Sequence, residues 1–154
     1  MNRITLCVVA VLALAGVAPA DEPQKANDSG APAGLIGGYT IVGGERYGEK
    51  ISAERIEGTT VRIAKDGIIV LDKEKKEVYA QTYTIDSSKT PWSITLKSKI
   101  TPYTKGNEET TAKGLIEKKG DTVRLIYALP GGEMPAEFKT KEKQLMFEMK
   151  NTSK

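Results

Sequence analysis

The sequence predicts an all-β fold: a barrel of about eight antiparallel strands in up-and-down order, with at most one short helical turn. Short runs rich in β-branched and aromatic residues alternate apolar with polar side chains, which is typical of half-buried strands. Turn signals separate these runs, and no long helical pattern competes with them. A meander must hide its edge strands, and this order favours closure into a barrel over a sandwich.

Residues 1–20 are predicted to be a secretory signal peptide. Arg3 precedes an uninterrupted apolar run, and the small residues Ala18 and Ala20 form the A-x-A cleavage pattern. The run is too short to span a bilayer, which takes about 20 residues. A buried N-terminal strand or helix is the alternative. We expect cleavage after Ala20, an extracytoplasmic location (secreted or periplasmic), and no membrane insertion after cleavage.

The mature chain is expected to hold one domain. Residues 21–34 are polar and rich in Pro, Ala and Gly, which predicts a disordered tether. The β-barrel domain is expected over residues 35–151, and residues 152–154 form a flexible tail.

The first strand is predicted over Gly38–Val42, ending at the turn signal Gly43-Gly44. Ser52 is then expected to cap one helical turn over residues 52–56. The next two strands flank Asp66-Gly67. This dipeptide predicts a tight hairpin in which both turn positions have positive φ.

The later strands show clear apolar faces. Trp92, Ile94 and Leu96 alternate with polar residues, and the side chains of Leu125 and Tyr127 share one face of their strand. The strands on either side of Asp66-Gly67 and those that follow are predicted over residues 59–65, 68–71, 78–85, 92–96, 110–117, 122–129 and 144–150.

The residue inventory excludes several kinds of chemistry. The chain has no histidine, and its one cysteine, Cys7, lies in the predicted signal peptide, so nucleophilic triads and His or Cys zinc sites are excluded. There is no helix-opening phosphate loop and no spaced Asp ligand set. We expect no enzyme, no cofactor and no metal. The net charge is +3, and lysines and glutamates intersperse, so nucleic acid is not an expected partner.

Three segments carry a resemblance to a known family. They are Leu35-Ile36-Gly37-Gly38-Tyr39, Asp86-Ser87-Ser88-Lys89-Thr90-Pro91, and Gly120–Leu125 running into Pro130–Phe138. In this order they resemble an uncharacterised secreted-domain family described mainly from planctomycetes and grouped with lipocalin-like barrels. The resemblance covers residues 35–151. It implies a ligand-holding barrel, and it brings no established activity.

The resemblance also implies how the barrel closes. In lipocalins, a Trp of the first strand packs under an Arg of the last strand. Tyr39 and Lys150 stand at these positions here, so they are expected to close the barrel through a weaker cation–π contact.

Two functions remain open for the domain. One is a non-catalytic lipocalin-like barrel that binds a small apolar or amphipathic ligand at its open end. The other is a filled-core structural or protein-interaction module of the envelope or extracellular space. An eight-stranded barrel is only just wide enough to hold one small ligand, so the size of any cavity separates the two. The candidate ligand-binding residues are Tyr79, Gln81, Tyr83, Trp92, Arg124 and Tyr127.

Overall fold

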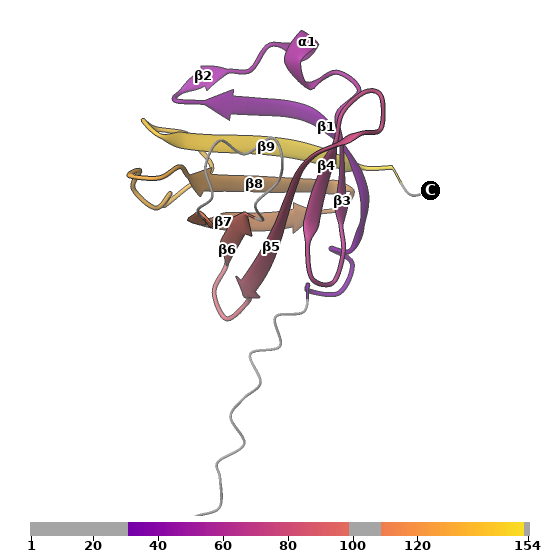
Figure 1. Ribbon diagram of the computed structural model, residues 1–154. Coiled ribbons are helices and arrows are strands. Elements are labelled where there is room, and N and C mark those ends of the chain that lie inside the picture. The colour runs from indigo at the N-terminus through magenta and orange to yellow at the C-terminus, as the bar shows by residue number, and fades with distance from the viewer. Residues whose placement is uncertain (1–30, 99–108, 153–154) are drawn as a thin grey trace, which may run out of the picture.

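Eight antiparallel strands close into a barrel in the computed structural model, which describes residues 31–98 and 109–152 (Figure 1). Each strand pairs with the next, and the first pairs with the last, so the predicted all-β barrel is confirmed. The strands are β1 (Gly37–Arg46), β3 (Thr60–Ile63), β4 (Ile68–Leu71), β5 (Glu77–Asp86), β6 (Trp92–Ser98), β7 (Thr111–Lys119), β8 (Thr122–Ala128) and β9 (Gln144–Asn151).

The connection between β1 and β3 holds two short elements, β2 (Glu49–Lys50) and α1 (Ala53–Ile56). The strand β2 pairs with the end of β1, and α1 is the predicted helical turn. Ser52 caps α1 only through its backbone: its carbonyl accepts a hydrogen bond from the Arg55 N–H at 3.0 Å, and its side chain forms no cap bond.

The hairpin predicted at Asp66-Gly67 is confirmed, but its predicted turn type is wrong. Ile63 pairs with Ile68, so four residues connect β3 and β4. The Ala64 N–H donates to the Gly67 carbonyl at 2.8 Å, and neither Asp66 nor Gly67 has a positive φ. The longer loop removes the need for a left-handed backbone.

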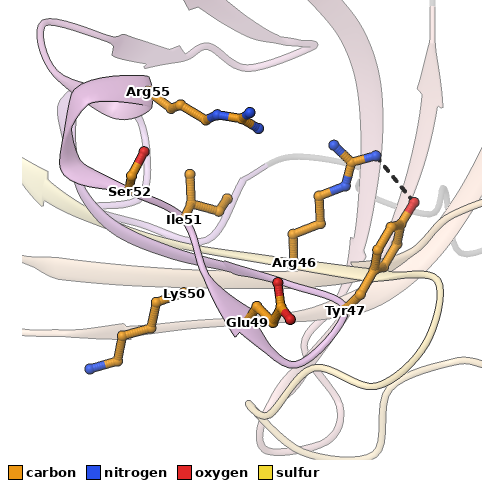
Figure 2. Close-up of a pocket in the computed structure, with 7 residues that line it drawn as sticks. All are labelled: Arg46, Tyr47, Glu49, Lys50, Ile51, Ser52 and Arg55. Atoms are coloured by element: carbon orange, nitrogen blue, oxygen red, sulfur yellow. Dashed lines mark hydrogen bonds between the residues drawn. The ribbon is translucent and has the colours of Figure 1, made fainter.

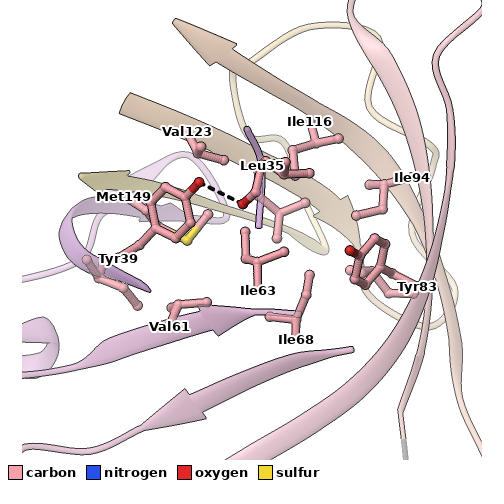
Figure 3. Close-up of a cluster of buried hydrophobic side chains, with 13 residues drawn as sticks. Leu35, Tyr39, Val61, Ile63, Ile68, Tyr83, Ile94, Ile116, Val123 and Met149 are labelled. Atoms are coloured by element: carbon pink, nitrogen blue, oxygen red, sulfur yellow. Dashed lines mark hydrogen bonds between the residues drawn. The ribbon is translucent and has the colours of Figure 1, made fainter. Parts of the chain in front are cut away.

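One end of the barrel is filled by side chains, and we call it the filled end (Figure 3). Leu35 and Tyr39 are fully buried there, and the Tyr39 hydroxyl donates to the Leu35 carbonyl at 2.7 Å. The Leu35 N–H in turn donates to the Pro32 carbonyl at 3.0 Å, and Ala31 packs against the core. The last four residues of the predicted tether therefore lie against the barrel.

The predicted signal peptide, with Ala18 and Ala20, and residues 21–30 of the tether lie outside the described residues. Within the described ranges, no helix is long and apolar enough to cross a membrane.

Candidate functional site

Beyond the filled end, the barrel holds an apolar cavity of about 370 Å³. Inward-facing side chains of six strands, together with the residue that follows β8, line this cavity. They are Ile41, Val61, Ile68, Val70, Tyr79, Gln81, Leu125, Tyr127, Leu129, Leu145, Phe147 and Met149.

The lining residues form two levels. The buried ones, which apart from Gln81 belong to the packed core, are called the floor: Ile41, Val61, Ile68, Gln81, Leu125 and Met149. The half-buried ones lie closer to the β4–β5 turn and the β8–β9 connection, and we call them the rim: Val70, Tyr79, Tyr127, Leu129, Leu145 and Phe147. The change from buried to half-buried shows that the cavity opens toward the rim.

Gln81 is the one polar residue of the floor. It is 5 % exposed, and its carboxamide has no hydrogen-bond partner among the described residues. Its strand neighbour on the same face, Tyr83, already belongs to the packed core, so Gln81 marks the depth at which the cavity ends on β5. A buried amide left without partners costs roughly 1–3 kcal/mol. This position is therefore suited to a bound polar group.

Two tyrosines add hydroxyl groups at the rim. The Tyr79 hydroxyl bonds to the Ser98 side chain, whose Oγ lies 2.6 Å from the Thr110 Oγ1. Burial raises the pKa of Tyr79, and the bond to Ser98 partly offsets this. The pKa of Tyr127 is also raised, mainly by burial and further by the neighbouring Tyr79. Both side chains are thus neutral at physiological pH.

The Tyr127 hydroxyl has no hydrogen-bond partner within the part of the chain that the structure describes. Among the described residues, the lining of the cavity includes no Asp, Glu, Lys or Arg. This part of the lining is therefore uncharged, with polar capacity concentrated at Gln81 and the two tyrosines.

The structure brings together three of the six residues predicted to bind a ligand: Tyr79, Gln81 and Tyr127. Tyr83 lies deeper, in the core, where its hydroxyl donates to the Ala64 carbonyl at 2.6 Å. Trp92 is half-buried against the core and does not line the cavity, since it begins β6 at the filled end.

Arg124 requires a correction, because it lies outside the barrel. Val123 and Leu125 occupy the inner face of β8, so the alternation of a strand turns Arg124 outward. Its Nε donates to the Glu117 Oε1 at 2.6 Å, and its guanidinium lies 4.7 Å from the centre of the Phe138 ring.

The structure does not bring Tyr39 and Lys150 together. Lys150 pairs with Thr40 and is exposed on the outer face, whereas Tyr39 is buried inside the barrel. Adjacent residues of a strand point to opposite faces, so the expected cation–π closure is replaced by the bond from Tyr39 to Leu35.

The sequence pattern does not distinguish the aliphatic lining residues from residues of a filled core. The alternation of apolar and polar residues along a strand shows which side chains point into the barrel. It does not show whether those side chains reach the side chains of the opposite wall. The combination of Gln81 with two tyrosines on an otherwise aliphatic inner face was the available signal.

A second hollow, of about 480 Å³, lies on the surface beside β2 and α1 (Figure 2). Arg46 stacks on Tyr47 at 4.8 Å and donates to its hydroxyl at 3.3 Å, while Lys50 points away from both arginines of the hollow. These cations do not converge on one point. Among the described residues, no three acidic side chains gather to hold a metal ion either.

No family model, curated protein or solved structure matches this chain. The resemblance to the planctomycete family stays a prediction, and the cavity itself carries the functional argument.

Proposed function

We propose that this protein is an exported, non-catalytic barrel that binds one small, largely apolar molecule in the cavity between floor and rim. One observation carries the proposal: an apolar cavity whose buried floor contains the carboxamide of Gln81, unpartnered among the described residues. Buried polar groups are normally hydrogen bonded, so an unpaired one facing an apolar cavity suggests a ligand-binding site.

The cavity volume is consistent with this role. An apolar cavity of about 150 Å³ is enough to bind benzene. The cavity here, about 370 Å³, is more than twice that size and lies at the lower end of the range for ligand pockets. A filled-core module would have no need of this space, which disfavours that alternative.

The cavity can be tested by blocking it. Val70 lies on the rim, so Val70→Trp should place an indole in the cavity and weaken saturable binding of a hydrophobic dye at least about tenfold, with the fold retained by circular dichroism. Ile69, its neighbour, pairs with the outward-facing Arg62 and does not line the cavity, so Ile69→Trp is the matched control and should bind as the wild type does.

The dye titration is read by fluorescence and repeated by calorimetry with medium-chain amphiphiles. The proposal would be contradicted if no compound bound saturably to the wild-type protein. It would equally fail if a folded Val70→Trp variant bound with unchanged affinity. Either result would return the domain to the filled-core or interaction class.

Export is tested separately. The charge at Arg3, the apolar run after it and the small residues Ala18 and Ala20 support cleavage after Ala20. N-terminal sequencing of protein collected outside the cytoplasm should begin at Asp21, and an intact Met1 there would contradict the proposal.

A further inference from the structure

We infer that the cavity selects an uncharged ligand that enters with its hydrogen-bonding group first and pairs that group with Gln81 on the floor. This inference rests on the proposed ligand-binding function and specifies the chemistry of the ligand. It follows from the depth of the polar groups and from the residues that surround them.

The order of side chains along the strands sets the orientation. On β5, the half-buried Tyr79 precedes the buried Gln81. On β8 and β9, the outermost lining residues, Leu129 and Leu145, are apolar. The carboxamide of Gln81, unpartnered among the described residues, is thus at the bottom, and the described lining from there to the opening is hydrocarbon apart from the hydroxyls of Tyr79 and Tyr127. A ligand that matches this order has its polar group at the floor and its apolar part toward the rim.

The residues that line the cavity determine which charge a bound ligand can carry. None of the lining residues that the structure describes is charged, and both tyrosines of the rim stay neutral because burial raises their pKa values. Ser98 opposite Gln81 is neutral as well, and its Oγ already contacts Thr110. An ionised group at the floor would lose its hydration without gaining an opposite charge, which is costly. A carboxylate is therefore excluded from the floor.

The carboxamide of Gln81 offers one acceptor and two donors. A primary or secondary amide complements both functions, and an alcohol does so with a single group. The hydroxyl of Tyr127, unpartnered among the described residues, lines the same cavity from β8 and is available to a second polar atom of the ligand. Neutral amides and alcohols with a hydrocarbon tail are the ligand class that these groups fit.

The test compares ligands of matched length. By the benzene comparison, the cavity admits on the order of twelve heavy atoms, so the probes are decanamide, decan-1-ol and decanoate. Calorimetry on the purified wild-type protein at pH 8 should show decanamide binding at least about tenfold tighter than decanoate. Decanoate should gain affinity as the pH is lowered toward the pKa of its carboxyl group, whereas decanamide should not respond to pH.

Gln81→Met replaces the carboxamide by an apolar chain of similar volume. It should weaken decanamide at least about fivefold and leave binding of butylbenzene unchanged or tighter. Thr82→Val is the matched control, because Thr82 faces away from the cavity on the same strand. If Gln81→Met does not fold, the side-chain amide signals of Gln81 in wild-type protein replace it: decanamide should shift them, and decanoate at pH 8 should not.

The outcomes separate this inference from the proposed function. Binding of neither butylbenzene nor any decyl compound would overturn both. Tight butylbenzene binding with equal affinities for decanamide and decanoate would overturn only the inference. The same holds if Gln81→Met binds decanamide as the wild type does.

Discussion

Tyr39 is the residue that ties the start of the domain to the filled end of the barrel. It is fully buried, and its hydroxyl donates to the Leu35 carbonyl at 2.7 Å while the side chain of Asn151 also bonds to it. Leu35 is itself fully buried, so its carbonyl depends on this donor. One hydroxyl thus connects the segment before β1 with β9, at the seam where the barrel closes.

We expect Tyr39→Phe to lower the free energy of unfolding by about 1–3 kcal/mol, because it leaves a buried carbonyl without a donor. Urea denaturation measures this change. Tyr47→Phe is the control: Tyr47 is exposed and its hydroxyl only accepts from Arg46, so the loss there should stay within about 0.5 kcal/mol. Equal losses from the two variants would show that the bond to Leu35 does not stabilise the fold.

The pair β7–β8 depends on one glycine. Gly114 pairs with Tyr127, and a Cβ at Gly114 would lie 2.7 Å from the Tyr127 Cα and would collide with the Ile126 carbonyl. The backbone of Gly114 has no positive φ, so the constraint is close approach and not conformation. This approach positions Tyr127, a rim residue of the cavity.

We predict that Gly114→Ala destabilises the protein by about 3 kcal/mol, the upper end of the usual cost of overpacking, since backbone atoms of β8 must move to admit the methyl group. Gly120→Ala is the matched control in the β7–β8 turn. Its added Cβ meets nothing within 4 Å, and only the φ of +58° opposes it, at about 1–2 kcal/mol. Thermal or urea unfolding measures both. A cost for Gly114→Ala no larger than that for Gly120→Ala would contradict the close-approach argument.

The positions of the strands could be predicted because apolar and polar residues alternate along a strand that has one buried face. The sequence analysis predicted that the first strand ends at Gly43-Gly44. In the structure, β1 continues to Arg46 through a bulge between Ile41 and Gly43. A Cβ at Gly44 would lie 3.0 Å from Ile51 Cδ1 and 3.3 Å from Phe147 Cδ1. Gly44 thus permits close packing, and a local sequence pattern cannot distinguish that purpose from a turn.

The outer face of β8 shows the same limit of local patterns. Ile126 is fully buried although it points away from the barrel interior. The chain after β8 folds back beside this face: Phe138 stacks on Arg124, and Met134 lies near Ala128. Alternation predicts one buried face for β8, and the second arises only from this tertiary contact. The cavity likewise depends on tertiary structure, because side chains from six strands together set its volume.

At the scale of the whole molecule, the pairing of β1 with β9 makes one continuous sheet, so the core at the filled end and the cavity belong to the same closed barrel. Four tyrosines, from three different strands, have pKa values that depend on burial in this barrel. Burial is the main cause that raises the pKa values of Tyr39, Tyr79, Tyr83 and Tyr127 above 10.0.

Raised tyrosine pKa values make the stability of the barrel sensitive to alkaline pH. Below about pH 9 these tyrosines are protonated in both the folded and the unfolded chain, so they contribute no pH dependence. Above that value the unfolded chain releases protons that the folded chain still holds. The free energy of unfolding therefore falls as the pH rises toward the pKa values of the folded state, by about 1.4 kcal/mol per pH unit for each tyrosine that remains protonated.

We expect urea denaturation between pH 8 and pH 11 to show a level region followed by a fall that begins near pH 9 and steepens through pH 10. Tyr127→Phe should reduce the steepness of this fall by about one proton, since Tyr127 has the most strongly raised pKa of the four. The variant also separates this effect from the deprotonation of other groups, because those groups are the same in both proteins. A Tyr127→Phe profile that ran parallel to the wild-type profile up to pH 11 would contradict the burial of the Tyr127 hydroxyl inside a closed barrel.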